Sequence, residues 1–222
     1  MFSWSITLPE RRSSGLASTT KPCATLHIES DERAGEELSL PAAVGSVLSA
    51  KEKAGELHPT GRGELLLLVQ ETTEHCAMLR VEKLINRRDY TTLELDQKLK
   101  LDGYEEELRR RVIGRAVECG LVSNERYGAS FVRSKLASGW GLLRIERELR
   151  ERGIEPQGLR GWPEAFLDDA GGEYERALAT ARRHGLPERR GVEKLARYLY
   201  QRGYSSDCAL RAARAVAEEV AC

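Results

Sequence analysis

The chain has 222 residues, of which 32 % are charged and 6 % are aromatic, and its formal net charge is zero. This length accommodates one or two domains, and a composition rich in Glu, Arg, Leu and Ala is typical of helical proteins with long solvated faces. The zero net charge excludes a strong overall field for nucleic acid or membrane surfaces. The longest apolar run is LLLLV at residues 65–69, far short of the ~18 residues that a membrane span needs.

The N-terminal segment and the cysteines indicate a reducing compartment. No apolar signal core opens the chain, so we expect a cytoplasmic protein. The five cysteines are odd in number and include no C-x-x-C pair, which argues against a disulfide framework and against a zinc site. We expect Cys76, Cys119 and Cys208 to be buried free thiols, and we expect no metal or other cofactor.

The first part of the chain predicts a small module that contains strands. Residues 1–22 are rich in Ser, Thr and Arg without a hydrophobic period and predict a disordered tail. The segment ATLHIES (24–30) alternates apolar and polar residues as a half-buried strand does, and ELSLP (37–41) can pair with it. AAVGSVLS (42–49) predicts a short helix. Residues 23–63 are therefore expected to form a β-hairpin-like module.

From residue 64 onward the sequence is helical and repeats every 50 residues. Four columns align without gaps in three successive units, the sign of a repeat architecture. The first two columns lie four residues apart, on one helix face, and the glycine column follows where a helix needs a left-handed residue to end. The fourth column can pack back on that helix end. The columns are Leu95, Ile145 and Leu195; Leu99, Leu149 and Leu199; Gly103, Gly153 and Gly203; and Tyr104, Ile154 and Tyr204.

Each unit is predicted to contain three helices, so the expected fold is mainly α, with tandem three-helix repeats that stack into an elongated, curved body. The repeats are expected at 64–121, 122–171 and 172–222. The helices are predicted at 70–87, 91–101 and 105–119; 124–137, 141–152 and 155–168; and 173–184, 189–201 and 205–219. Gly158, Gly161 and Pro163 fall inside the third helix of the middle repeat and weaken that prediction.

The sequence carries no catalytic motif, whether P-loop, dinucleotide fingerprint or H-E-x-x-H, and we predict a protein that is not an enzyme. Its charge pattern is more informative. Residues 181–203 hold seven Lys and Arg against two Glu, a local net charge of +5 (7 − 2). Arg190, Lys194 and Arg197 lie at i, i+4 and i+7, which predicts a basic stripe for phosphate or an acidic protein surface. An ordinary solvated face is the alternative.

The middle repeat holds a second group of candidate contact residues. The segment FVRSKLASGWG (131–141) brings Arg133 and Lys135 close to Trp140, which stands between two glycines. An aromatic residue at a helix entry is either a packing anchor for the next helix or a contact point for a partner. Both readings stay open at this point.

Two further candidates, Arg144 and Arg147, follow on the next predicted helix. Arg144 precedes Glu148 by four residues, and Arg147 precedes Glu151 by the same spacing. Glu146 and Arg150 have the same spacing. The segment therefore predicts three surface ion pairs of ~0.3–0.5 kcal/mol each, although Arg144 and Arg147 also remain candidates for a partner contact.

The stretch FVRSKLASGWGLLRIERELRERGI (131–154) resembles the signature of the RecX family, F-V-x-S-[RK], then G-[YW]-G, then R-I-x-x-E-L-x-x-[KR]-G-I. EKLARYLYQRGYSSDCALRAA in the third unit and INRRDYTTLELDQKL in the first are similar to the family's outer units. The resemblance covers about residues 64–220. Ser123 and Asn124 stand where the family usually has an acidic pair, and Leu142 where a proline is common.

The resemblance implies a regulator that binds the filament of the RecA recombinase on single-stranded DNA and modulates, most often inhibits, filament extension, ATP hydrolysis and strand exchange. It implies contacts to RecA or to DNA from the candidate residues in the two C-terminal repeats, and we expect a monomer that does not bind membranes. Two alternatives stay open. One is a helical-repeat protein that binds DNA directly, and the other is a scaffold that binds protein alone.

Overall fold

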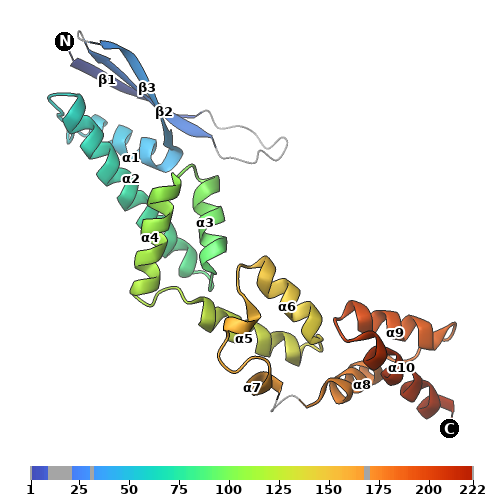
Figure 1. Ribbon diagram of the computed structural model, residues 1–222. Helices are drawn as coiled ribbons and strands as arrows, with labels where there is room; N and C mark the ends of the chain where they lie inside the picture. The colour runs from blue at the N-terminus through green and yellow to red at the C-terminus, as the bar shows by residue number, and fades with distance from the viewer. Residues whose placement is uncertain (1, 10–21, 31–32, 168–170, 222) are drawn as a thin grey trace. The chain divides into compact units, whose positions relative to one another are not determined.

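The computed structural model describes residues 2–9, 22–30, 33–167 and 171–221 (Figure 1). The chain divides into two compact units, Met1–Val122 and Ser123–Cys222. The first unit contains β1 (Phe2–Thr7), β2 (Cys23–Ser30), β3 (Arg33–Pro41), α1 (Ala42–Lys53), α2 (Arg62–Ile85), α3 (Thr92–Leu101) and α4 (Glu106–Glu118). The second contains α5 (Asn124–Ala137), α6 (Leu142–Glu151), the short 3-10 helix η1 (Pro156–Gly158), α7 (Glu164–Leu167), α8 (Glu173–His184), α9 (Gly191–Gln201) and α10 (Ser206–Ala221).

The three strands form one antiparallel sheet in the order β1-β2-β3. The predicted hairpin of β2 and β3 is confirmed, but the predicted disordered tail is wrong for Phe2–Thr7, which pairs with β2 along its whole length. In β1 the apolar residues Phe2, Trp4 and Ile6 alternate with polar ones and pack against the core. This two-residue period is that of a half-buried strand. The rest of the predicted tail, residues 10–21, lies outside the described residues.

The sheet, α1 and the first three-helix repeat share one hydrophobic core. Leu26 of β2, Leu48 of α1 and Leu65 of α2 are fully buried in it. Helix α2 begins at Arg62, eight residues before the prediction, because the apolar run at 65–69 belongs to the helix and turns Leu65 and Val69 toward the core. Residues 23–63 therefore pack as part of the same body as the first repeat.

Three of the four repeated columns are buried, and the glycine column ends each helix as the sequence predicts. The six residues of the first two columns are fully buried, and the fourth column is at most 5 % exposed. Each repeat glycine has a positive φ of +90°, +72° or +93°. After it, the next backbone N–H donates to the second-column carbonyl, at 3.1 Å from Tyr104 to Leu99, 2.9 Å from Ile154 to Leu149 and 3.2 Å from Tyr204 to Leu199. This is the Schellman ending, in which a left-handed residue closes the helix.

The third helix predicted for the middle repeat, at 155–168, is wrong. The chain forms only η1 and the four-residue α7 there, and residue 168 lies outside the described part. Gly161 takes a φ of +76°, and Pro163 cannot donate a helical hydrogen bond. Leu159 and Phe166 of this segment are nonetheless buried against α5 and α6, so the segment closes the core without being a helix.

The third repeat is a regular three-helix unit. Helix α8 has the predicted bounds, and α9 and α10 agree with the prediction to within two residues. Alanines fill the core where α10 meets its neighbours, with Ala177 and Ala181 on α8 facing Ala212 and Ala213 on α10 in one buried cluster. Small side chains allow close approach of the helix backbones.

Candidate functional site

The predicted contact residues of the middle repeat do not form one group. Lys135 and Arg144 do lie over Trp140, with the Lys135 Nζ 4.8 Å and the Arg144 Cζ 3.8 Å from the ring centroid. Arg133 points elsewhere, with its Cζ 5.4 Å from the ring centroid of Phe166. Positions two residues apart on a helix differ in direction by about 200°, so Arg133 and Lys135 point to nearly opposite sides of α5.

Trp140 is the end of a small aromatic cluster that sequence reasoning missed. Tyr127 stacks on Phe131 at a centroid distance of 6.3 Å, and Phe131 meets Trp140 edge-on at 6.4 Å. The Arg152 guanidinium lies 4.8 Å from the Phe131 centroid. The spacing of Tyr127 and Phe131, four residues apart on α5, was the available signal. Trp140 therefore serves as a packing anchor, and its partly exposed edge remains a candidate contact.

Of the three ion pairs predicted on α6, that of Glu146 and Arg150 is confirmed at 3.3 Å, and that of Arg144 and Glu148 is wrong. Glu148 pairs with Arg152 at 2.6 Å, while Arg144 turns to the Trp140 face and donates to the Gln201 carbonyl at 3.4 Å. Arg147 does lie near Glu151, at 3.8 Å between nitrogen and oxygen. Both side chains of this pair are well exposed, so the pair contributes little to stability and leaves Arg147 available to a partner.

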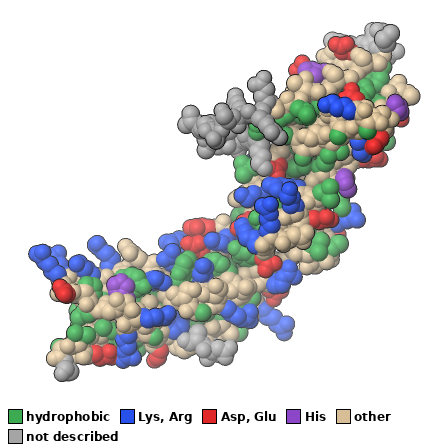
Figure 2. Space-filling view, turned by 180° about the vertical axis from the view of Figure 1, so that it is seen from behind, with side chains coloured by type: hydrophobic (Ala, Val, Ile, Leu, Met, Phe, Trp, Pro, Cys, Tyr) green, Lys and Arg blue, Asp and Glu red, His purple; other side chains and the backbone are tan. Residues whose placement is uncertain are grey.

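The basic stripe of the third repeat is exposed as predicted. Arg190 is the N-cap of α9 and takes a left-handed φ of +52°, and Lys194 and Arg197 follow on that helix. All three are exposed, and the described residues place no carboxylate in contact with them. On the face drawn in Figure 2, Lys and Arg side chains are prominent over the C-terminal helices. Exposed and unpaired cations keep their full charge available to an anionic partner.

The middle and third repeats meet through two glycines. The Gly141 N–H donates to the Arg202 carbonyl at 2.8 Å, and the Leu143 N–H donates to the Gly203 carbonyl at 3.2 Å. Helix α6 has no side-chain cap, so the end of α9 satisfies its first N–H groups. A Cβ atom on Gly141 would overlap the Gly203 carbonyl. The repeat glycine thus ends its own helix and also joins two repeats.

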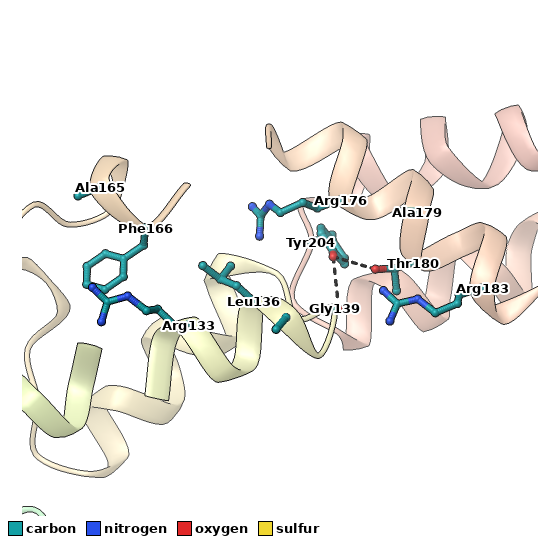
Figure 3. A pocket seen from close by; sticks show the side chains of 11 residues that line it. Arg133, Leu136, Gly139, Ala165, Phe166, Arg176, Ala179, Thr180, Arg183 and Tyr204 are labelled. Atoms are coloured by element: carbon teal, nitrogen blue, oxygen red, sulfur yellow. Dashed lines mark hydrogen bonds between the residues drawn. The ribbon is translucent and has the colours of Figure 1, made fainter. Parts of the chain in front are cut away.

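A cavity of about 420 Å³ lies beside this junction, between α5, α7 and α8 (Figure 3). At its floor the Tyr204 hydroxyl donates to the Gly139 carbonyl at 3.3 Å and is within 3.1 Å of the Thr180 hydroxyl. Burial raises the pKa of Tyr204, against the opposing effect of the Thr180 hydrogen bond and of the nearby Arg176 charge. Arg133 lines the cavity together with Arg176 and Arg183, two residues that sequence reasoning did not single out.

Other kinds of site find no support among the described residues. They contain no cluster of three or more His, Cys, Asp or Glu side chains placed to hold a metal ion. Cys76 and Cys208 are buried as predicted, and burial raises the pKa of each thiol, which disfavours the reactive thiolate. Cys119 is exposed, which corrects its predicted burial. In the described part of the chain, no helix combines the length and apolar character that crossing a membrane requires.

The architecture defines a protein of tandem three-helix repeats whose second unit presents basic and aromatic surfaces. A family model described as "RecX, second three-helix domain" matches residues 123–157, which lie in the middle repeat. A regulatory protein RecX of Halorhodospira halophila is 35 % identical over 142 residues, covering 62 % of this chain and 85 % of the relative. One of Mycobacterium sp. strain JLS is 34 % identical, covering 64 % and 80 %.

The chain therefore belongs to the RecX family of regulatory proteins. Two solved structures share its fold. A crystal structure of RecX from Lactobacillus salivarius superposes with a TM-score of 0.53 at 17 % identity, covering 64 % of this chain and 96 % of that one. A second, titled regulatory protein RecX, superposes with a TM-score of 0.51 at 20 % identity, covering 83 % and 92 %.

Proposed function

We propose that this protein regulates the RecA recombinase by binding its filament on single-stranded DNA and limiting filament extension, ATP hydrolysis and strand exchange. The observation that carries the proposal is membership in the RecX family, supported by relatives at about 35 % identity that it spans over most of their length. Its place of action is then the cytoplasm, where RecA filaments assemble.

The exposed cations of the second unit support a filament as the partner. The α9 stripe of Arg190, Lys194 and Arg197 has no carboxylate partner among the described residues, so it can meet phosphates or an acidic protein surface. In the middle repeat, Lys135, Trp140 and Arg144 form a second candidate contact. A filament that offers both DNA and protein suits two such surfaces on one chain.

The test is RecA's ATP hydrolysis on single-stranded DNA, with this protein titrated in at substoichiometric amounts. We expect the rate to fall, because a regulator that blocks filament extension acts on many RecA subunits at once. An unchanged rate with folded, helical protein would refute the proposal. Binding to bare DNA that is tight and steeply salt-dependent would then favour the direct DNA binder, and no DNA binding would favour the scaffold.

A charge-reversal variant tests the stripe. Replacing Arg190, Lys194 and Arg197 by Glu should weaken inhibition, because these exposed cations would then repel an anionic partner. A matched control replaces three exposed lysines of the first unit, Lys53, Lys98 and Lys100, by Glu, which makes the same change in net charge elsewhere. Equal inhibition by the stripe variant and the wild type would remove the stripe from the contact surface.

A further inference from the structure

The cavity beside the junction of the second and third repeats is strongly basic. Its lining includes Arg133 from α5 and Arg176 and Arg183 from α8, and the lining residues include no Asp or Glu. Figure 3 shows these three side chains among those that line the pocket, with Leu136 between Arg133 and Arg176 and with Phe166 beside Arg133. Three cations around one partly apolar cavity repel one another, and a bound anion would relieve that repulsion.

Arg176 is the feature that points to a ligand. Its side chain belongs to a residue only 8 % exposed. Its Nε donates to the Gly171 carbonyl at 3.2 Å, but both Nη atoms are out of solvent contact and have no hydrogen-bond partner among the described residues. A buried guanidinium that lacks a counter-charge is costly, and proteins ordinarily pair it.

The other buried arginine among the described residues shows the usual arrangement. Arg109, equally buried at 8 %, donates from Nε to Asp96 at 2.7 Å and from Nη1 to the Tyr104 carbonyl at 2.8 Å. Arg176 has one carbonyl partner and no carboxylate among the described residues. Unlike Arg109, Arg176 is therefore a buried cation without a counter-charge in the described part of the chain.

The number and placement of the donors indicate the ligand's chemistry. The hydroxyls of Thr180 and Tyr204 are already engaged with each other and with Gly139, so the remaining side-chain donors of the described lining residues are guanidinium groups. Several guanidinium groups that approach from two helices suit a tetrahedral oxyanion, which offers acceptor oxygens in several directions. A carboxylate offers two oxygens in one plane and would satisfy fewer of them.

We propose that this cavity binds a phosphate group, with Arg176 as the buried anchor and the exposed Arg133 and Arg183 at its mouth. The guanidinium is the flexible end of a long side chain, so a change in its terminal torsion angles turns an Nη atom toward the bound group. The group can come from a nucleic-acid backbone or from free phosphate, since both present the same oxygens. The test of this site uses the protein without RecA. Its result can therefore be distinguished from the outcome of the RecA ATPase test.

The experiment follows the Arg176 Nε–Hε signal of the full chain by ¹H–¹⁵N NMR, assigned by its absence in R176M. Inorganic phosphate and a short oligothymidylate are titrated separately, with acetate at matched ionic strength as the control anion. We expect the signal to shift with phosphate, with the oligonucleotide or with both, and not with acetate. If the oligonucleotide shifts the signal at a lower total concentration of phosphate groups than inorganic phosphate does, the nucleic-acid backbone is the source. If only inorganic phosphate shifts the signal, the ligand is the free anion.

Variants separate the site from general charge. R183Q, at an exposed position that should fold normally, is expected to weaken phosphate binding by about tenfold, the effect of losing one charge-assisted contact. R214Q, which removes an exposed charge of the same unit away from the cavity, should bind as the wild type does. Equal binding by R183Q and R214Q would overturn the proposal.

The alternative to a bound phosphate is a carboxylate of the chain itself as the counter-charge of Arg176. Of the carboxylates that lie outside the described residues, Asp168 and Asp169 are the nearest to Arg176 in the sequence. If one of them neutralises Arg176, the double variant D168N/D169N will shift the Arg176 signal while phosphate leaves the wild-type signal in place. That result, or an equal response to acetate and phosphate, would overturn the proposal. A phosphate response retained in D168N/D169N supports it.

Discussion

The junction between the middle and third repeats can be tested with glycine-to-alanine variants at Gly141 and Gly203, with Gly103 of the first unit as the reference. Gly103 has a φ of +90°, and a Cβ atom there would meet its nearest neighbour, the Cys23 Sγ, at an ordinary 3.4 Å. Gly141 has an ordinary φ of −82°, but its Cβ would overlap the Gly203 carbonyl. Gly203 combines both problems, with a φ of +93° and a Cβ only 2.5 Å from the Arg144 backbone nitrogen.

These geometries give three different losses in the free energy of unfolding. G103A carries only the left-handed backbone cost of about 1–2 kcal/mol. G141A carries the cost of overpacking, about 1–3 kcal/mol, and weakens two inter-repeat hydrogen bonds. G203A should cost most, about 2–5 kcal/mol, because it combines the backbone cost with the overlap. The double variant G141A/G203A should cost less than the sum, since both substitutions break the same contact.

The assay is urea denaturation followed by tryptophan fluorescence. In a W4F background the remaining tryptophans, Trp140 and Trp162, both report on the second unit, whereas in W140F/W162F Trp4 reports on the first. We expect G141A and G203A to lower the midpoint of the second unit only, and G103A that of the first only. A G141A protein as stable as its background would refute the close approach of α6 to the end of α9.

Three further predictions concern single side chains. R176M should raise the free energy of unfolding of the second unit by about 1–3 kcal/mol in phosphate-free buffer, because it removes unsatisfied buried donors. In urea denaturation with added phosphate, this gain over the wild type should be smaller. A loss of stability in R176M would show that Arg176 is already paired. Y204F should cost about 0.5–1.5 kcal/mol at neutral pH through its lost hydrogen bonds. Since burial raises the pKa of Tyr204 above its ordinary 10.0, the stability it contributes is complete below that pH and is lost as the pH rises through the folded pKa. Alkaline denaturation of the second unit should therefore be less steep in Y204F, whereas Y104F should leave that unit unchanged. T91A should cost about 0.5–2 kcal/mol, because Thr91 accepts from the Glu94 N–H and the Glu94 carboxylate accepts from the Thr91 N–H, each at 3.1 Å; a thermal melt equal to the wild type would contradict this capping box.

The candidate site was only partly accessible from the sequence. The shared face of Lys194 and Arg197 on α9 could be predicted, because a helix fixes the relative direction of residues three apart. Arg190 caps that helix with a left-handed φ of +52°, so helical spacing does not fix its direction. The predicted grouping of Arg133 with Trp140 was wrong, because Arg133 lies against Phe166 of a later segment. The direction of a long side chain depends on such neighbours, which the local sequence does not specify. Arg144 left its predicted partner Glu148 for the Trp140 face, a choice that depends on where α9 ends. Arg176 carried no signal at all, since its burial follows from the packing of α8.

The sequence by itself determined the repeat and its endings. Each repeat needs buried residues four positions apart on one helix face and a glycine with a positive φ at the helix end. Both requirements are local, because they involve residues of a single helix and its ending. The tertiary structure decided whatever joins distant segments: the pairing of Phe2–Thr7 with β2, the glycine contact between two repeats and the burial of Arg176. Such features depend on which surfaces meet after the helices form. A short-range pattern cannot encode that choice, because the free energy that selects it comes from burial shared between segments far apart in the chain.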